Sequence, residues 1–217
     1  MKINLFTCYY KDKDADRANE LSLCLKKNLS AGFDNIYILT ENAEEQKLCN
    51  NIVFQNNKKA DVINFSSRPS FNDFFKLMKE QRFASDINVL SNSDIYFEDL
   101  QSIKDIMSNV KANRMCLALS RWDVQPDGSA VHFKRWDSQD TWIFYGNPAI
   151  TTQENYTMGI AGCDNKLAYE LETAGYFVIN PSCTIKTFHY HLSNIRNYIN
   201  GDVIERIPPP YKLVNPI

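Results

Sequence analysis

Segments with the length of β-strands alternate with segments that have the periodicity of α-helices over the first hundred residues of this chain. Apolar runs predict strands at Lys2–Tyr9 and Asn35–Thr40. Between them, apolar side chains recur at helical spacing at Ala18, Leu21, Leu25 and Leu29. Strand, helix, strand is the pattern of an α/β sheet whose parallel strands are joined by crossover helices.

The same alternation continues to about residue 90. The sequence predicts a short charged helix at Asn42–Asn50, a third strand at Ile52–Gln55 and a buried strand at Asp86–Leu90. Ser70 has the position of a helix N-cap, and the apolar stripe that follows it consists of Phe71, Phe74, Phe75 and Met78. We therefore expect one domain over residues 1–217, of the α/β class, with an open mixed sheet flanked by helices. Such sheets bind ligands beyond the carboxyl ends of their strands.

Charge and composition exclude several classes of protein. The 217 residues hold 24 lysines and arginines against 26 aspartates and glutamates, so the net charge is 24 − 26 = −2. This balance argues against a protein that binds nucleic acid through a basic face. No apolar run approaches the roughly 20 residues of a membrane span, and the six cysteines show no metal-like spacing. We expect a cytoplasmic protein without a membrane span, whose cysteines are buried free thiols.

A short polar segment follows the strand predicted at Asp86–Leu90. It reads Asn92-Ser93-Asp94, and apolar sequence resumes at Ile95. A carboxylate at the end of a strand can hold a divalent cation against phosphate oxygens, because Mg²⁺ and Mn²⁺ favour oxygen ligands. The alternative is that Asp94 caps a turn.

Two of the three histidines form a His-x-His pair, His189 and His191. In an extended segment these two side chains point to the same face. One imidazole could therefore complete a metal site that Asp94 begins, and a hydrogen-bonded surface pair is the alternative. His132 is assigned no role.

A second acidic position lies at the start of a predicted helix. Asp164 follows Gly162 and Cys163 there, as either an N-cap or a general base with a substrate hydroxyl above it. Residues 135–144 are dense in Trp, Asp and Arg, and aromatic faces beside carboxylates suit sugar rings. The aromatic residues of this segment could equally be core residues. Asp140, in the same segment, competes with Asp164 for the role of base.

Arg68 lies two residues before the helix that Ser70 begins. An arginine and the free N–H groups of a helix N-terminus can both contact a diphosphate. A solvated loop arginine is the alternative, so Arg68 is a candidate that needs the other residues to support it.

In their order along the chain, these pieces resemble a GT-A glycosyltransferase, a metal-dependent enzyme that uses nucleoside-diphosphate sugars. Asn92-Ser93-Asp94 resembles the DxD motif of that family, with Asn in place of the first Asp. Gly162-Cys163-Asp164 resembles its acidic motif at a helix start, and His189 or His191 resembles its C-terminal metal histidine. The resemblance covers about residues 2–191.

The resemblance implies a transferase that moves a sugar from a nucleoside-diphosphate sugar to the hydroxyl of an unidentified acceptor. It implies Mn²⁺ or Mg²⁺, with a metal site formed by Asp94, His189 and His191. It also implies donor contacts at strand ends and before a helix, formed by Thr7, Tyr9, Glu41, Arg68, Asn92, Ser93 and Asp94. A base at Asp164, or at its competitor Asp140, implies inversion at the anomeric carbon.

The resemblance also suggests a division of labour along the single domain. Residues 1–97 are expected to bind the nucleotide sugar, and residues 98–200 to carry the acceptor and catalytic half. Residues 201–217 hold the run Pro208-Pro209-Pro210 and are expected to form an extended tail. This tail could cover the acceptor side, pack along the core or dock a partner.

Three other classes of protein stay open. A sugar-nucleotide pyrophosphorylase would share the α/β core, but it usually opens with a glycine-rich phosphate loop, and Phe6–Lys13 contains no glycine. A metal-dependent phosphoesterase would need carboxylates and histidines clustered early, whereas all three histidines lie past residue 130. In a non-enzymatic carbohydrate-binding or scaffold module, Asp94 and Asp164 would be caps and the tryptophans a flat platform.

Overall fold

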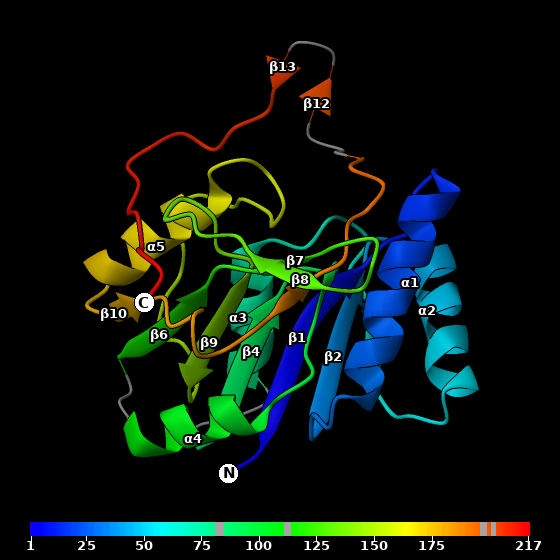
Figure 1. Ribbon diagram of the computed structural model, residues 1–217, viewed down its shortest axis with the longest axis horizontal. Helices are drawn as coiled ribbons and strands as arrows, with labels where there is room; N and C mark the ends of the chain where they lie inside the picture. The colour runs from blue at the N-terminus through cyan, green and yellow to red at the C-terminus, as the bar shows by residue number, and fades with distance from the viewer. Residues whose placement is uncertain (81–84, 111–113, 196–198, 201–202) are drawn as a thin grey trace.

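A computed structural model describes residues 1–80, 85–110, 114–195, 199–200 and 203–217. In this part of the chain the main sheet has seven strands in the order β10-β6-β9-β4-β1-β2-β3 (Figure 1). Strand β9 runs antiparallel to its neighbours β4 and β6, and the other pairings are parallel. The strands are β1 (Ile3–Tyr9), β2 (Asn35–Thr40), β3 (Asp61–Asn64), β4 (Ile87–Ser91), β6 (Met115–Leu119), β9 (Thr141–Tyr145) and β10 (Phe177–Ile179). The expected open mixed sheet is confirmed.

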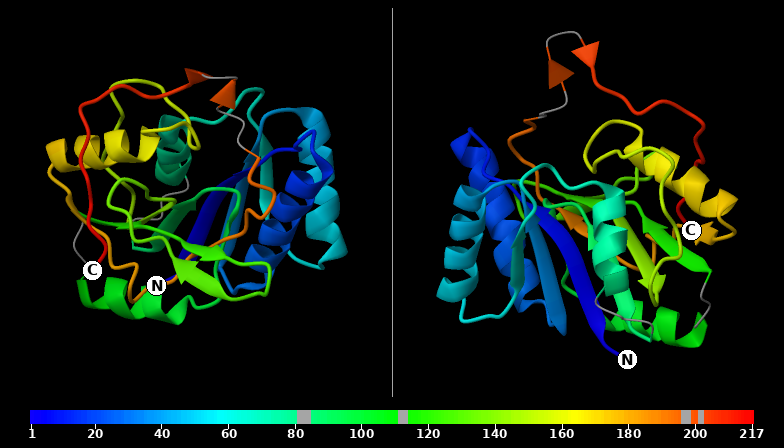
Figure 2. Two further views of the ribbon diagram at one scale, coloured as in Figure 1. Left: turned by 45° about the horizontal axis from the view of Figure 1, so that its top comes forward. Right: turned by 180° about the vertical axis from the view of Figure 1, so that it is seen from behind.

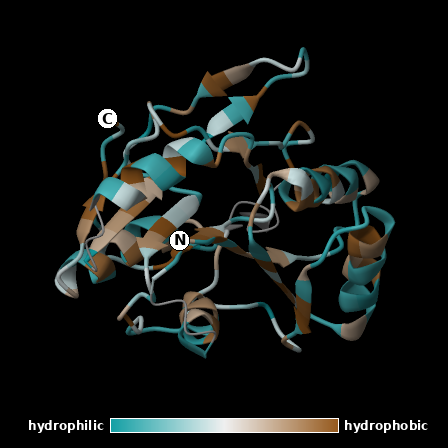
Figure 3. Cartoon of the chain, turned by 90° about the horizontal axis from the view of Figure 1, so that it is seen from below, coloured by the Kyte–Doolittle hydropathy of each residue, from teal (hydrophilic) through white to brown (hydrophobic). Residues whose placement is uncertain are grey.

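Helices cover both faces of this sheet, as the two views of Figure 2 show. Alternate residues of each strand belong to different core clusters, because side chains alternate across a sheet. Leu5 packs with α1 (Ala15–Ser30), α2 (Ala43–Gln55) and α4 (Gln101–Val110), whereas Phe6 packs with α3 (Phe71–Glu80) and α5 (Cys163–Thr173). The helices carry both hydrophobic and hydrophilic residues (Figure 3), as expected of helices with one face on a core. The expected flanking helices are therefore confirmed.

One predicted strand is wrong. The residues expected as a strand at Ile52–Gln55 are the last turn of α2, which begins after Asn42 and runs to Gln55. Cys49, Ile52 and Val53 are buried at helical spacing, so the apolar pair completes the stripe of that helix. The third strand is instead β3, which carries no apolar run because it is an edge strand with exposed ends.

A second, smaller sheet lies beside the main one, with the strand order β5-β11-β7-β8 (Figure 1). Its strands are β5 (Ile95–Tyr96), β11 (Phe188–His189), β7 (Trp122–Val124) and β8 (Ala130–His132). In its register His189 pairs with Ile95 on one side and with Asp123 on the other. This sheet therefore brings together three segments that are far apart in the sequence. A separate hairpin consists of β12 (Ile199–Asn200) and β13 (Val203–Ile204).

The described end of the chain, residues 205–217, is extended and lies along the start of α5. The backbone N–H of Ile207 donates to Ala161 O, that of Lys212 to Asn165 O, and that of Val214 to Trp136 O. The side chain of Val214 is buried in the cluster of α3 and α5. Of the three uses expected for the tail, packing along the core is the one that these contacts support.

All six cysteines are free. Four are buried, as expected, whereas Cys8 is partly exposed and Cys183 is exposed. None of the helices in the described part of the chain combines the length and the apolar character needed to cross a bilayer.

Candidate active site

A pocket of about 690 Å³ lies beyond the carboxyl ends of β1, β2 and β4. Tyr10 follows β1 in its wall, Glu41 follows β2, and Asp94 follows β4. Its other wall comes from the segment before β9 and from the loop that leads into α5. The pocket thus occupies the place where open α/β sheets bind their ligands.

Asp94 lies in the turn between β4 and β5, and its carboxylate is paired with two cationic groups. Arg17 Nη2 lies 2.6 Å from Asp94 Oδ2, and His189 Nε2 lies 3.3 Å from the same oxygen. Burial by itself would raise the pKa of Asp94, but His189 and Arg17 hold it well below its ordinary value. Asp94 is therefore an ionised carboxylate, which is the form that binds a cation.

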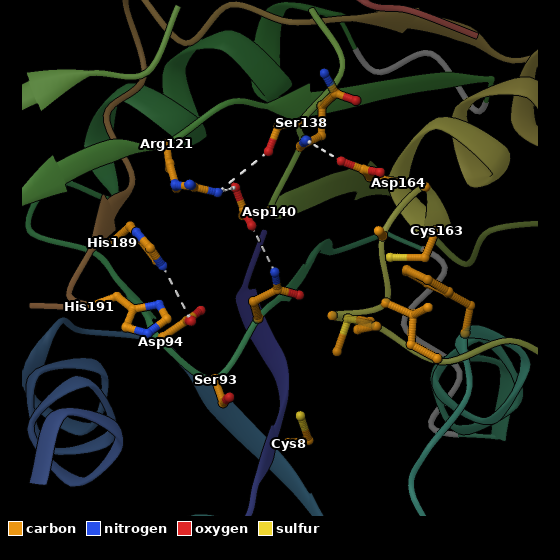
Figure 4. A pocket seen from close by; sticks show the side chains of 18 of the residues that line it. Cys8, Ser93, Asp94, Arg121, Ser138, Asp140, Cys163, Asp164, His189 and His191 are labelled. Carbon is orange, nitrogen blue, oxygen red and sulfur yellow. Dashed lines mark hydrogen bonds and ion pairs between the residues drawn. The ribbon is translucent and has the colours of Figure 1, made fainter. Parts of the chain in front are cut away.

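His189 is held between two carboxylates, as Figure 4 shows for Asp94. Its Nδ1 lies 2.8 Å from Asp123 Oδ1, and its Nε2 faces Asp94. Burial opposes the charged imidazole, but Asp94 and Asp123 together raise the pKa of His189 to about 9. A carboxylate on one ring nitrogen that directs the other toward a metal position is the usual arrangement around a metal-binding histidine.

His191 completes this cluster. Its ring centroid lies 5.4 Å from that of His189, and its buried Nε2 has no hydrogen-bond partner among the described residues. Burial, and then the charge of Arg17, lower the pKa of His191 to about 4, so the imidazole is neutral at pH 7. Ligand atoms of Asp94, His189 and His191 all lie within 4.8 Å of one another. The ionised carboxylate of Asp94 and the neutral, unpartnered imidazole of His191 fit a divalent metal such as Mn²⁺, and His189 can join them by giving up its proton when the metal binds.

Asp164 and Asp140 lie in the same pocket but have different surroundings. Asp140 accepts a hydrogen bond on each oxygen, from Asn92 Nδ2 at 2.8 Å and from Arg121 Nη1 at 3.1 Å. Asp164 accepts from two backbone N–H groups, those of Gln139 at 3.0 Å and Asn165 at 2.9 Å. Burial, and then the charge of Asp140, raise the pKa of Asp164 to about 7. A carboxyl group with a pKa near 7 suits general base catalysis.

The alternative that Asp164 is the N-cap of its helix is wrong. The N-cap of α5 is Gly162, whose φ of 83° lies in the left-handed region that favours glycine. Asp164 is the second residue of the helix, and its side chain reaches the backbone of Gln139 instead. The carboxylate is thereby fixed at the wall of the pocket.

Arg121, which sequence reasoning assigned no role, contacts both Asp123 and Asp140, and Figure 4 shows the contact with Asp140. Its Nε donates to Asp123 Oδ1 at 2.8 Å and its Nη1 to Asp140 Oδ2 at 3.1 Å. The guanidinium lies 4.2 Å from the ring centroid of Phe133. Arg121 therefore connects Asp123, which orients His189, with Asp140, whose charge acts on Asp164.

Arg17, on the first turn of α1, is also a residue that sequence reasoning missed. Its guanidinium bridges Asp94 and Glu20, with Nη1 lying 3.1 Å from Glu20 Oε2. A signal existed, because Arg17 falls on the same helix face as the buried Leu21 and Cys24. A charged residue on an apolar face needs a buried partner, and that requirement points to a charge elsewhere in the chain.

Two expected donor contacts do not reach the pocket. Thr7 is buried, with its hydroxyl donating to Ser91 O at 3.0 Å, and Tyr9 is buried in the cluster of α1, α2 and α4. Cys8 and Tyr10 line the pocket instead. Neighbouring residues of a strand point to opposite faces, so the prediction of Thr7 and Tyr9 was out of register by one residue.

The other expected donor residues do line the pocket. Glu41, Asn92, Ser93 and Arg68 all contribute to its wall. Arg68 Nη2 donates to Met158 O at 2.7 Å and thus bridges to the loop that leads into α5. Ser70 and Asp73 hydrogen-bond one another at the start of α3, which supports the cap expected there.

The aromatic segment before and within β9 divides between core and surface. Trp142 and Phe144 are core residues, each 1% exposed. Trp136, in contrast, is 54% exposed, next to the pocket residues Arg135 and Asp137. A flat apolar surface beside the pocket is therefore formed by Trp136.

Searches with protein-family models and among curated proteins find no match to this sequence. Solved structures do match. A mannosyltransferase from Pyrobaculum calidifontis, in complex with GDP-Man and Mn²⁺, has a TM-score of 0.58 at 8% identity, over 91% of this chain and 58% of its own. S. aureus TarS 1-349, in complex with UDP-GlcNAc, has a TM-score of 0.55 at 13% identity, over 90% of this chain and 60% of its own.

The chain thus spans about three fifths of the length of both structures. At these identities the likeness concerns the arrangement of strands and helices. The order of the sheet, the pocket beyond its carboxyl edge and these two matches agree with the resemblance seen in the sequence. The chain has the GT-A-like α/β fold of nucleotide-sugar glycosyltransferases.

Proposed function

We propose that this protein is a metal-dependent, inverting glycosyltransferase that moves a sugar from a nucleoside-diphosphate sugar to an acceptor hydroxyl. One observation carries the proposal: a single pocket holds both a cluster that fits a divalent cation and a partly exposed carboxyl group, Asp164, whose pKa is about 7. The two structural neighbours support it, because one was solved with GDP-Man and Mn²⁺ and the other with UDP-GlcNAc.

The donor is expected to lie against the half formed by residues 1–97. Asp94, His189 and His191 would hold the metal, and a bound divalent ion supplies a Lewis acid that stabilises charge on a leaving diphosphate. Arg68 adds positive potential on the same wall. Glu41, which lines the pocket beyond β2, would accept hydrogen bonds from the nucleoside.

The acceptor is expected to lie against the half formed by residues 98–200, with Asp164 as the base. Asp164 removes the proton of the acceptor hydroxyl while that oxygen attacks the anomeric carbon, and the nucleoside diphosphate leaves from the opposite face. A single displacement of this kind inverts the configuration. Asp140 is ion-paired with Arg121 at 3.1 Å, whereas Asp164 accepts hydrogen bonds from backbone N–H groups only, which favours Asp164 over Asp140 as the base. Trp136 offers its exposed face to an acceptor sugar ring.

A non-enzymatic carbohydrate-binding module is the second candidate, and the exposed Trp136 is the observation that favours it. A binding module, however, has no need of a carboxyl group with a pKa near 7. Perturbed titratable groups in a pocket are typical of catalytic sites. The enzyme is therefore the better supported function.

A thermal-shift screen tests the proposal. Wild type, Asp94→Ala and Asp127→Ala are measured with GDP, UDP, ADP and dTDP, each with Mn²⁺ and with EDTA. Asp127 is a matched control, because it lies in the exposed turn between β7 and β8. One diphosphate should stabilise wild type and Asp127→Ala only with Mn²⁺, and should leave Asp94→Ala unchanged.

Turnover is then measured as nucleoside diphosphate released from GDP-Man and UDP-GlcNAc. Release by wild type that Asp164→Asn lacks would support the transferase. No shift with any nucleotide, together with binding of free sugars, would contradict the proposal in favour of the binding module.

A further inference from the structure

We propose that Arg17 is a built-in counter-ion of Asp94 that keeps the metal affinity of the cluster low until a diphosphate is present. The proposal rests on the proposed function, because it concerns the same metal centre. It adds a residue outside the cluster of Asp94, His189 and His191, and it makes metal binding depend on the donor.

The guanidinium of Arg17 is fixed where it lies. Its side chain is 5% exposed, and it contacts Asp94 at 2.6 Å and Glu20 at 3.1 Å. Glu20 is itself held by Ser193, whose backbone N–H and hydroxyl donate to the carboxylate at 2.7 and 2.9 Å. Asp14 caps the same helix turn by accepting from the N–H of Arg17 at 3.0 Å. The side chain of Arg17 therefore cannot move to solvent without breaking both ion pairs, to Asp94 and to Glu20.

This placement sets up a competition for one carboxylate. Arg17 and His189 both contact Oδ2 of Asp94, so a divalent ion that binds there meets a fixed positive charge across the shared carboxylate. Repulsion between charges is strong at such sites, because little water screens it. A nucleoside diphosphate brings negative charge to the pocket and offsets Arg17. Metal without diphosphate should therefore bind weakly, and metal with diphosphate should bind well.

Paired substitutions test this without leaving a buried charge unpartnered. Arg17→Met with Glu20→Gln removes one positive and one negative charge together. Glu20→Gln alone removes one of the two carboxylates that Arg17 contacts, so that the full charge of Arg17 acts on Asp94. Arg135→Met with Asp137→Asn is the matched control, because it also removes an arginine and its carboxylate partner from the wall of the same pocket, where Arg135 is 58% exposed. Binding of Mn²⁺ is followed by the electron paramagnetic resonance signal of the free ion, with and without the diphosphate found in the thermal-shift screen.

We expect the double variant at Arg17 and Glu20 to bind Mn²⁺ alone about tenfold or more tightly than wild type, since it lacks the fixed repulsion. Glu20→Gln alone should bind Mn²⁺ more weakly, and the control pair should match wild type. If the double variant does not fold, the weaker binding of Glu20→Gln still decides the question.

Equal or weaker Mn²⁺ binding by the double variant would overturn the proposal, as would unchanged binding by Glu20→Gln. If wild type binds Mn²⁺ neither alone nor with any diphosphate, the proposed metal site is wrong, and so is the metal dependence of the proposed function. If wild type binds Mn²⁺ and these substitutions do not change that binding, only the proposed role of Arg17 is wrong.

Discussion

Replacing Asp164 by Asn separates the catalytic role of this carboxyl group from its structural one. The amide cannot accept a proton, so transfer should fall by about 10²- to 10⁴-fold, the usual contribution of a general base. In wild type the rate should fall about tenfold for each pH unit below 7, because only ionised Asp164 acts as the base and its pKa is about 7.

The same substitution should change how stability depends on pH. Folding raises the pKa of Asp164 from 3.8 to about 7, because burial and the charge of Asp140 disfavour the ionised form. The stability contributed by the protonated group is therefore fully present below pH 3.8 and is lost as pH rises through 7. Between pH 5 and pH 8 the loss is at most about 2.6 kcal/mol at 1.36 kcal/mol per unit. We expect about 1 kcal/mol, since the side chain is partly exposed.

Urea denaturation of wild type and Asp164→Asn at pH 5 and pH 8 measures this difference. Asn gives up one of the two backbone hydrogen bonds that Asp164 accepts, at about 1 kcal/mol, but that loss is the same at both pH values. The free energy of unfolding of the variant, relative to wild type, should therefore rise by about 1 kcal/mol from pH 5 to pH 8. Asp127→Asn is the control. A relative stability that does not change with pH, or a transfer rate close to that of wild type, would refute the reasoning.

Three further substitutions address the parts of the site that surround this base. Asp140→Asn should move the acidic limb of the pH–rate profile to lower pH, because it removes a charge that raises the pKa of Asp164; complete loss of transfer would make Asp140 the base. Asp123→Asn should weaken Mn²⁺ binding by about 10- to 100-fold, as loss of a metal histidine's orienting partner usually does; unchanged binding in the same resonance titration would contradict this. Gly162→Ala should lower the free energy of unfolding by about 1–3 kcal/mol in urea, because φ is +83° and a Cβ would lie 2.8 Å from Tyr211 Oη; equal stability would show that the tail yields.

The main sheet could be predicted because its strands and helices carry strong periodic patterns. The apolar runs at β1, β2 and β4 and the stripe of α3 lie where they were expected. The third strand could not be found, because β3 is an edge strand without an apolar run. The small sheet could not be found either, since strands of two or three residues are too short to show a period.

The site residues that could be predicted are those whose signals lie in the neighbouring sequence. Asp94 lies in the short turn after a strand, and Asp164 lies just after Gly162 at the start of a helix, so each is marked by its neighbours in the sequence. The partners that set the charge states of the metal cluster lie far away in the sequence: Arg17 is 77 residues from Asp94, and Asp123 is 66 residues from His189. Those contacts depend on strand register and helix packing, which the order of residues does not display. The motifs could therefore be predicted from the sequence, whereas the pKa shifts of these residues could be seen only in the structure.

The charged groups of the pocket form one connected series rather than two separate centres. Contacts join Arg17 to Asp94, Asp94 to His189, and His189 to Asp123. Arg121 then joins Asp123 to Asp140, whose charge acts on Asp164. A divalent ion at Asp94 would add positive charge at one end of this series, and electrostatic effects pass through buried pairs with little screening. The metal ion by itself should therefore favour ionised Asp164, and the negative charge of a diphosphate bound with it should offset this effect.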